Sequence, residues 1–252
     1  MRDRVLVAID GPAGAGKSTV ARRVAEQLGF VLVDTGALYR TVAFAATQGG
    51  VALDDGDGLG ALAEQLAGDR RIRFVAPQVL AAGEDPPDSR FGGSGVRVLL
   101  DGADVSEAIR TPLVSIAASQ VSAHPRVRGA LLDLQRQAGE GGGVVLEGRD
   151  IGTVVFPDAE VKFFLTANAT ERATRRQREL ADKGTTMSFA DTLAEVVQRD
   201  RADSERPVAP LRRADDALLV DSSGRDIADV VTEMVEVVRA RARELAAGEP
   251  GG

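Results

Sequence analysis

The chain has 252 residues, of which 44% are hydrophobic and 27% charged, a composition typical of a globular protein with one large domain or a core domain that carries an insertion. It has no cysteine and one histidine, which excludes disulfides, thiolate metal sites and cysteine nucleophiles and disfavours a histidine-based metal cluster or a Ser-His-Asp triad. The net charge of −7 disfavours a protein whose main task is to hold a nucleic-acid backbone.

No stretch of the sequence approaches the ~20 consecutive apolar residues that span a bilayer. The N-terminal segment MRDRVLVAID also lacks the longer apolar run and the cleavage site of a secretory signal. We therefore expect a soluble protein without a membrane segment. The absence of cysteine is compatible with the cytoplasm, which is the expected location.

The first predicted elements form a βαβ unit. Residues 5–9 are an apolar, β-branched run typical of a buried parallel strand. A glycine-rich turn follows, and residues 17–28 have a helical periodicity that ends at Gly29. Residues 30–33 form a second predicted strand, and two strands joined through a helix predict a parallel sheet.

The later part of the chain continues this alternation. Three further apolar runs predict buried strands, at residues 144–146, 161–165 and 218–220. Helical periodicity lies between or after these runs, at residues 170–181, 188–204 and 226–245. The predicted fold class is therefore α/β, with a doubly wound parallel sheet.

The middle of the chain interrupts the alternation. Strand-like pieces at residues 72–75 and 96–100 flank the segment GEDPPDSRFGGSG, whose Pro, Gly and Asp content predicts an exposed, mobile loop at 83–95. We therefore predict a smaller α+β subdomain inserted into the core. The predicted limits are residues 1–49 and 112–245 for the core, 50–111 for the insertion and 246–252 for a flexible tail.

Residues 11–18 fit the phosphate-loop pattern G-x-x-x-x-G-K-[ST]. Its glycines allow a tight loop whose backbone N–H groups point at phosphate oxygens, and the helix that begins near Lys17 adds its dipole to the same anion site. Lys17 can reach the β- and γ-phosphates of a nucleotide, and the Ser18 hydroxyl can bind Mg²⁺. A merely flexible glycine turn is disfavoured, because a predicted strand precedes the loop and a predicted helix leaves it.

The loop alone indicates a nucleoside triphosphate and does not choose among kinases, GTPases, motors and transport ATPases. A guanine-reading N-K-x-D does not occur in the sequence, which argues against a GTPase. The short chain, without a second ATP-handling module, argues against a motor.

A kinase for a phosphorylated acceptor must bind two anions that face each other. Arginine suits this task because guanidinium binds phosphate bidentately and keeps its charge. Arg40 follows the second predicted strand by one helical turn, and Arg149 and Asp150 directly follow a later strand. Ligands of open α/β sheets bind beyond such strand ends, where Glu147 is a candidate to hold Mg²⁺ or its water shell.

A third cluster of charged residues consists of Arg199, Asp203 and Arg206, and their spacing places them on one face of a predicted helix. Ser188 and Asp191 predict the N-terminal capping box of that helix. The alternative interpretation of this face is a solvated, salt-bridged surface.

Four arginines crowd the helix predicted at residues 170–181, namely Arg172, Arg175, Arg176 and Arg178. They form either an exposed basic face or part of a mobile lid over the nucleotide, at about residues 172–187. His124, which precedes Pro125, fits a helix boundary better than a catalytic base.

Five ordered segments carry these motifs: IDGPAGAGKST (9–19), DTGALYR (34–40), AASQVSAHPRVR (117–128), EGRDIGTVVFPDA (147–159) and RDRADSERPVAPL (199–211). Together they resemble the bacterial-type cytidylate kinases, nucleoside monophosphate kinases of the P-loop class, over nearly the whole chain. The resemblance implies a P-loop NTPase fold with an inserted monophosphate-binding subdomain and a helical lid. It also implies in-line transfer of the γ-phosphoryl group of ATP to CMP or dCMP, with Mg²⁺.

Carried over by position, the resemblance implies that the phosphate loop and two lid arginines bind ATP. These residues are Gly11, Pro12, Ala13, Gly14, Ala15, Gly16, Lys17, Ser18, Thr19, Arg172 and Arg176. It implies catalytic roles for Lys17, Arg149 and Arg206, and Mg²⁺ at Ser18 with Glu147 in its outer shell.

The resemblance also implies an acceptor site. The matching residues are Arg40, Arg149 and Arg206 at the phosphate, Arg199 and Asp203 at the ribose, Ser119, Arg128 and Asp150 at cytosine, and Thr35 and Arg110 elsewhere in the site. Asp150 can accept from the N4 amine of cytosine, while Arg128 and Ser119 can donate to its N3 and O2. Uracil would bring its O4 against the carboxylate, which would repel it.

The sequence departs from the family pattern in a longer insert at residues 83–95, which an exposed loop tolerates, and in Glu147, where relatives often have aspartate. The alternatives are a kinase for another nucleoside monophosphate or small phosphorylated metabolite, and a non-catalytic nucleotide-binding regulator or nucleic-acid-binding protein. The net charge and the acceptor motifs disfavour the second class. We expect small-molecule substrates, no nucleic-acid or membrane partner, and a monomer.

Overall fold

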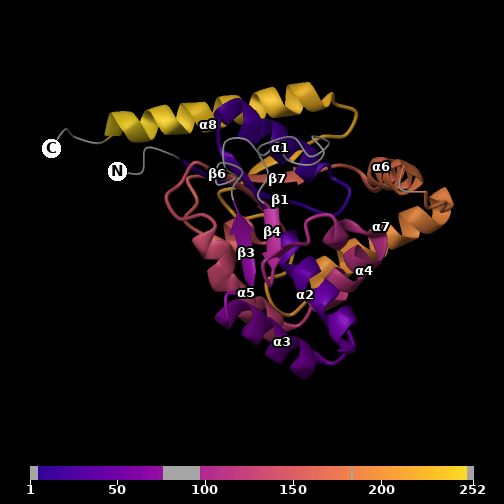
Figure 1. The fold of residues 1–252 in the computed structure, drawn as a ribbon. Coiled ribbons are helices and arrows are strands. Elements are labelled where there is room, and N and C mark those ends of the chain that lie inside the picture. The colour runs from indigo at the N-terminus through magenta and orange to yellow at the C-terminus, as the bar shows by residue number, and fades with distance from the viewer. Residues whose placement is uncertain (1–4, 76–96, 183, 249–252) are drawn as a thin grey trace, which may run out of the picture. The chain divides into compact units, whose positions relative to one another are not determined.

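The computed structural model describes residues 5–75, 97–182 and 184–248, and the chain divides into two compact units (Figure 1). The terminal unit combines residues 1–30 with 141–252, and the middle unit comprises residues 31–140. The loop predicted at 83–95 lies outside the described residues.

Four parallel strands form the sheet of the terminal unit, in the order β6-β1-β7-β8. They are β1 (Leu6–Asp10), β6 (Val144–Gly148), β7 (Val161–Thr166) and β8 (Leu218–Asp221). With β2 (Val31–Asp34), the order of the whole sheet is β2-β6-β1-β7-β8. Every residue of β1 is buried, as expected for an apolar parallel strand covered on both faces. All five strands predicted for this sheet are confirmed, each within two residues of its predicted limits.

The described part of the terminal unit has four α-helices, which are α1 (Lys17–Leu28), α6 (Ala169–Asp182), α7 (Phe189–Glu205) and α8 (Ile227–Gly248). Helix α1 packs against α8, and α6 packs against α7 (Figure 1). Helix α8 continues past its predicted end at residue 245, because the alanines that follow favour helix. Residues 246–248 of the predicted tail are therefore helical.

In its described residues, 31–75 and 97–140, the middle unit has four α-helices and a small antiparallel sheet in the order β3-β4-β5. The elements are α2 (Gly36–Gly49), α3 (Gly56–Gly68), β3 (Ile72–Val75), β4 (Arg97–Leu100), β5 (Ala103–Asp104), the 3-10 turn η3 (Ala108–Arg110), α4 (Pro112–Val121) and α5 (Pro125–Gln137). The two predicted strand pieces are confirmed as β3 and β4. Helices α2, α3, α4 and α5 and strand β5 were not predicted, although His124 was expected at a helix boundary.

The core of the middle unit is built where α2 packs on α4 and α3 packs on α5. Leu38, Leu59, Leu66 and Leu131 from these helices are buried in it. Each such side chain contributes about 1.5–3 kcal/mol by leaving water. The segment 50–111 thus shares one hydrophobic core with the helices before and after it. That residues 50–111 act as a functional subdomain stays a prediction.

Residues predicted to mark helix ends do so in both units. Gly29 ends α1 with a φ of 66°, in the left-handed region that favours glycine. Ser188 caps α7, because its Oγ accepts a hydrogen bond from the amide of Asp191 at 3.1 Å. His124 is the N-cap of α5, with Pro125 in the first helical position.

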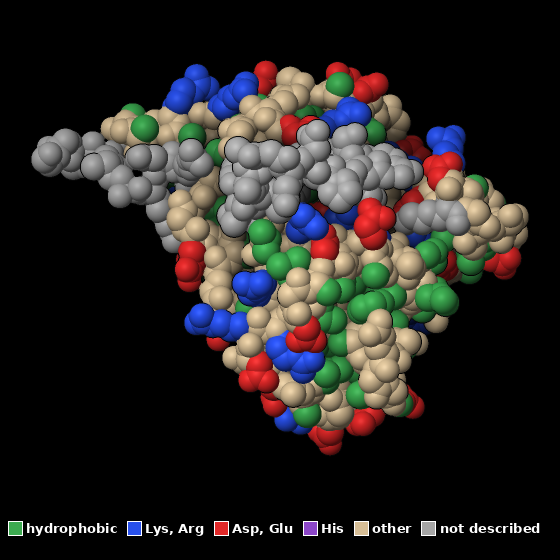
Figure 2. Space-filling view, in the orientation of Figure 1, with side chains coloured by type: hydrophobic (Ala, Val, Ile, Leu, Met, Phe, Trp, Pro, Cys, Tyr) green, Lys and Arg blue, Asp and Glu red, His purple; other side chains and the backbone are tan. Residues whose placement is uncertain are grey.

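Helix α4 buries its small residues and exposes larger ones. Ala117, Ala118 and Val121 are buried, whereas Leu113 is 80% and Ile116 51% exposed. Hydrophobic side chains gather over α2 and α4 on the face shown in Figure 2. Within the described ranges, no helix is long and apolar enough to cross a membrane.

Candidate active site

The loop between β1 and α1 has a backbone that requires glycine. Gly11 has a φ of 153°, and a Cβ there would lie 1.9 Å from the carbonyl oxygen of Leu165. Gly14 and Gly16 have φ angles of 74° and 87°, in the left-handed region. Gly16 is also the N-cap of α1, and no side chain caps the helix there. The first amides and the dipole of α1 therefore favour an anion at this loop.

Lys17 is buried at the start of α1, and its Nζ donates to the carbonyl oxygen of Pro12 at 2.7 Å. Burial lowers the pKa of Lys17 well below its ordinary value, and the charges of Arg149 and Arg199 lower it further, against two nearby carboxylates. A phosphate at the loop would oppose these effects and favour the charged lysine. The loop thus has a lysine and two nearby arginines that can meet the charge of a phosphate chain.

Two oxygen atoms that suit a magnesium ion lie side by side. Ser18 Oγ, in the first turn of α1, donates to Oε2 of the buried Glu147, on β6, at 2.9 Å. Magnesium in nucleotide sites usually takes one or two protein oxygens and keeps waters and phosphate oxygens in its other positions. The hydroxyl and the carboxylate together fit such an ion.

Asp10, the last residue of β1, organises the turn after β6, although no sequence pattern singled it out. Its two carboxylate oxygens accept hydrogen bonds of 2.8 Å from the first two amides of the π-helical turn η4 (Ile151–Val155). Burial raises the pKa of Asp10 to about 6, against the effect of these two hydrogen bonds, and the charge of Asp150 raises it as well. A buried carboxylate therefore holds the backbone that directly follows Arg149 and Asp150.

Arginines and aspartates from β6 and α7 form one network. Arg149 Nε donates to Asp203 Oδ2 at 2.9 Å, and the Arg206 guanidinium lies 3.6 Å from Asp150 and 3.8 Å from Asp203. Burial opposes ionisation of Asp203, but the charge and hydrogen bond of Arg149 keep its pKa below the ordinary value. The predicted shared helical face needs one correction. Helix α7 ends one residue before Arg206, which caps it in an extended conformation and still reaches both aspartates.

Arg199, on α7, has a buried Nε without a hydrogen-bond partner among the described residues. Burial and the charge of Arg149 lower its pKa to about 10. In the middle unit, the Nε of Arg40 is also buried without a hydrogen-bond partner among the described residues. An unsatisfied buried N–H costs free energy, so each of these atoms favours a ligand oxygen beside it.

The two lid arginines predicted to bind ATP are both paired with acids of the terminal unit. Arg172 binds Asp200 through two hydrogen bonds, of 2.8 and 2.5 Å. Arg176 lies 3.3 Å from Glu179 and 3.6 Å from Glu195. These partners orient both guanidinium groups, and contact with ATP stays a prediction for each.

In the middle unit, Asp34 interacts with two of the predicted acceptor arginines, Arg40 and Arg110. Arg40 Nη2 donates to its Oδ2 at 2.6 Å, and a Cβ on Gly36 would lie 3.1 Å from both side chains, so glycine leaves room for the pair. Burial opposes ionisation of Asp34, but the charges of Arg40 and Arg110 keep its pKa below the ordinary value. Thr35 is buried next to this pair, at the N-cap of α2.

The predicted cytosine readers of the middle unit are on α4 and α5. Arg128 is buried, lies over the ring of Tyr39 at 5.2 Å from its centroid, and donates to the carbonyl oxygen of Ser122 at 3.3 Å. Ser119 is half-buried on α4. Tyr39 was not predicted as a site residue, although it lies in the motif that contains Arg40. An aromatic residue next to a site arginine was the available signal.

These features define a class of protein. A glycine loop leads from a buried parallel strand to a helix whose first residue is a buried lysine, and a serine hydroxyl meets a carboxylate from the neighbouring strand. Arginines gather at the end of that same strand. The terminal unit is therefore a nucleotide-binding unit of the P-loop class.

The family model described as Cytidylate kinase matches residues 7–240, so the chain belongs to this family of phosphotransferases. The cytidylate kinase of Syntrophotalea carbinolica is 53% identical over 241 residues, which cover 96% of this chain and 94% of that protein. The cytidylate kinase of Geobacter sulfurreducens is 48% identical over 242 residues, 96% of each chain. A crystal structure of an uncharacterized protein from Eubacterium ventriosum is similar in fold, with a TM-score of 0.50 at 11% identity over 94% of this chain and 99% of that one. The resemblance carried by the five sequence segments is thereby confirmed.

Proposed function

We propose that this chain catalyses the ATP-dependent phosphorylation of CMP and dCMP to CDP and dCDP. One observation carries the proposal. Within the terminal unit, the charges of Arg149 and Arg199 act on Lys17, which supports a role for these two predicted acceptor arginines near the phosphate loop. The family and the names of the most similar relatives support cytidylate as the acceptor.

On the donor side, the loop at residues 11–19 binds the phosphates of ATP through its backbone amides, which all of its residues except Pro12 have, and through Lys17. Arg172 and Arg176 close over these phosphates. Ser18 and Glu147 would hold Mg²⁺. When bound, this ion neutralises charge on the phosphate oxygens. Positioning and charge neutralisation are the main sources of catalysis in phosphoryl transfer.

The acceptor phosphate is already ionised, so the reaction needs no strong general base. One of its oxygens forms a bond to the γ-phosphorus while the bond from that phosphorus to the β–γ bridging oxygen breaks, and ADP leaves. Arg149 and Arg206 neutralise the charge on the acceptor phosphate. Their carboxylate neighbours Asp203 and Asp150 orient both guanidinium groups before the substrate arrives, which lowers the reorganisation needed during transfer.

The base and the sugar are assigned to separate groups of residues. Asp150 accepts from the cytosine amine, and Arg128 and Ser119 donate to its ring acceptors. Arg199 and Asp203 bind the ribose, for which the unsatisfied Nε of Arg199 supplies a donor. The remaining acceptor contacts are assigned to Thr35, Arg40 and Arg110.

The same proposal includes the organisation of the chain. Residues 1–49 and 112–245 act as the core, residues 50–111 as the monophosphate-binding subdomain and residues 172–187 as the lid. Closure over bound substrates would exclude water and limit wasteful ATP hydrolysis. The enzyme would work as a cytoplasmic monomer on small-molecule substrates.

A coupled assay of ADP release tests the proposal with Mg·ATP and a panel of CMP, dCMP, UMP, AMP, GMP and shikimate. We expect strong preference for CMP and dCMP, and little ADP release without an acceptor. Activity confined to another acceptor would retain the kinase core and discard the cytosine assignment. Tight ATP binding without transfer to any acceptor would favour the alternative function, a non-catalytic nucleotide-binding regulator.

A further inference from the structure

Helix α6 is in close contact with the phosphate loop, and two of its arginines donate to carbonyl groups of the loop. A Cβ on Gly14 would lie 3.0 Å from the backbone oxygen of Arg172, so the loop and the helix are in close contact. Arg172 Nη1 donates to the carbonyl oxygen of Ala13 at 3.1 Å, and Arg175 Nη1 donates to that of Ala15 at 3.2 Å. The two arginines are three residues apart and thus share one face of α6.

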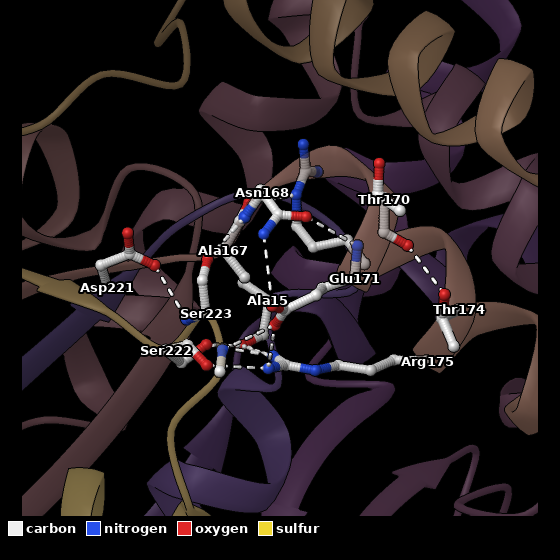
Figure 3. Close-up of polar contacts among 12 residues, drawn as sticks. Ala15, Ala167, Asn168, Thr170, Glu171, Thr174, Arg175, Asp221, Ser222 and Ser223 are labelled. Carbon is white, nitrogen blue, oxygen red and sulfur yellow. Dashed lines mark hydrogen bonds and ion pairs between the residues drawn. The ribbon is translucent and has the colours of Figure 1, made fainter.

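Ser222, which directly follows β8, completes the contact at Ala15 (Figure 3). Arg175 Nη1 donates to its Oγ at 3.0 Å, and Nη2 donates to its carbonyl oxygen at 2.9 Å. The buried Ser222 hydroxyl lies 3.0 Å from the carbonyl oxygen of Thr166 and 3.4 Å from that of Ala15. One guanidinium therefore ties the loop to the ends of β7 and β8.

The guanidinium of Arg175 is itself oriented by neighbouring groups (Figure 3). Glu171 Oε2 accepts from Arg175 Nη2 at 3.3 Å and from the amide of Gly224 at 3.1 Å. Asn168 accepts a hydrogen bond of 2.8 Å from the amide of Glu171, at the start of α6. The arginine thus meets the loop as part of a connected network rather than as a mobile surface side chain.

These contacts act on the orientation of the peptide groups in the loop. A peptide group is planar, so a carbonyl held toward α6 directs the amide of the same peptide group to the opposite side. The phosphate loop works through amides that point inward together. A donor that carries positive charge forms stronger hydrogen bonds than a neutral one, and the four such bonds of Arg175 leave its guanidinium little freedom.

We propose that Arg175, acting with Ser222 on the Ala15 carbonyl, is a positioning residue that holds the phosphate loop in its ATP-binding conformation. The inference rests on the proposed function in one respect, namely that this loop binds the ATP phosphates. It gives Arg175 a role that differs from the direct ATP contact predicted for Arg172 and Arg176.

The test uses the full-length enzyme with Arg175→Met, Ser222→Ala and the double variant. We expect the KM for ATP to rise roughly tenfold in each single variant, from the loss of a charge-assisted contact, while the KM for CMP changes by less than about twofold. Affinity for AMP, which lacks the β- and γ-phosphates, should not change. The double variant should be little worse than either single one, because both act on the same carbonyl. Ser222→Thr, which keeps the hydroxyl, should retain most of the ATP affinity.

Hydrogen exchange in the absence of nucleotide gives the readout that separates positioning from direct contact. We expect faster exchange of the amides in the segment 12–19, where every residue except Pro12 has one, in Arg175→Met and Ser222→Ala. The matched control is Arg239→Met, on α8, because Arg239 also donates to a backbone carbonyl, that of Gln27 on α1, at 3.1 Å. This control should leave both the loop amides and the KM for ATP unchanged.

Two results would overturn the inference. Lower ATP affinity with unchanged exchange at residues 12–19 would mean that Arg175 contacts the nucleotide directly. Faster exchange throughout the terminal unit, with ATP and CMP affected alike, would mean a general loss of stability. If Arg175→Met does not fold, Ser222→Ala tests the same contact. ATP affinity is measured by calorimetry without an acceptor, so a failure of CMP turnover does not decide this question.

Discussion

Site arginines bind carboxylates in both units, as Arg149 does in the terminal unit and Arg40 in the middle unit, but Arg128 of the middle unit lies over an aromatic ring. In the terminal unit, Arg149 and Arg172 bind carboxylates, those of Asp203 and Asp200. In the middle unit, Arg128 lies over an aromatic ring and donates to a backbone carbonyl. A carboxylate orients a guanidinium and also offsets its charge, whereas an aromatic face orients it without adding a negative charge.

The difference fits the tasks that we assign to these arginines, since those bound to carboxylates serve phosphates and Arg128 serves the base. Phosphates are multiply charged, so a site that must also release its product benefits from arginines already balanced by acids. Around Lys17, the two arginines Arg149 and Arg199 are likewise matched by two carboxylates. Recognition of a neutral base depends instead on the direction of a few donors and acceptors, which a ring contact can maintain.

Replacement of Lys17 should have the largest effect and test the charge balance of the terminal unit. We expect Lys17→Ala to lower kcat by about 10³-fold or more, because it removes the cation closest to the transferred phosphate. Folding should be unaffected, since burial and two nearby arginines disfavour the charged lysine in the free protein. Steady-state kinetics and thermal unfolding measure both effects. Retained turnover in this variant would mean that the phosphate site lies elsewhere.

Asp10 should make stability depend on pH in the terminal unit. Its pKa is raised from 3.8 to about 6 in the folded protein, so folding favours the protonated form. The stability that this group contributes is therefore present below about pH 4 and is lost as pH rises to about 6, a change of about 3 kcal/mol.

The measurement is the free energy of unfolding in urea at several pH values, for the wild type and for Asp10→Asn. Between about pH 4 and pH 7, the free energy of unfolding of the wild type should fall relative to that of Asp10→Asn, because the asparagine does not titrate. A difference that is constant, or that shifts toward the wild type as pH rises, would contradict a raised pKa for Asp10.

Asp150 should connect base choice with the arginine network. We expect Asp150→Asn to lower kcat/KM for CMP by about 10²-fold, since a charged hydrogen bond to the cytosine amine is lost. Activity with UMP should fall much less or rise, because an amide can donate to the uracil O4. The ratio of kcat/KM for CMP to that for UMP is the quantity to measure. An equal fall with both acceptors would assign Asp150 only to the orientation of Arg206.

Arg128 should give the smallest of these effects and should be confined to the acceptor. We expect Arg128→Met to raise the KM for CMP about tenfold while the KM for ATP stays within about twofold. Arg126→Met is the matched control on the same helix, because the Arg126 pair with Glu64 is exposed and should contribute little. If both variants change the KM values for ATP and CMP alike, Arg128 does not have the separate role in acceptor binding that distinguishes it from the phosphate-binding arginines.

Sequence reasoning located most of the elements but not all of their contacts. Helix α1 has its predicted limits, because a glycine turn and Gly29 delimit it locally. Helix α3 was missed, since it lies in a segment rich in glycine and aspartate that resembles a loop. Helical spacing brought Asp203 and Arg206 together correctly, but it could not show that the helix ends between them.

The sequence by itself determined the phosphate loop, the order of strands and helices along the chain, and the family. These depend on short-range rules, such as a glycine where φ is positive or an apolar run where a strand is buried on both faces. Only the tertiary structure decided which groups serve the loop and its neighbours. Asp10 binds amides about 140 residues away, and Arg175 meets a serine 47 residues later in the sequence. Such contacts arise where strands and helices pack, and no local pattern of residues records them.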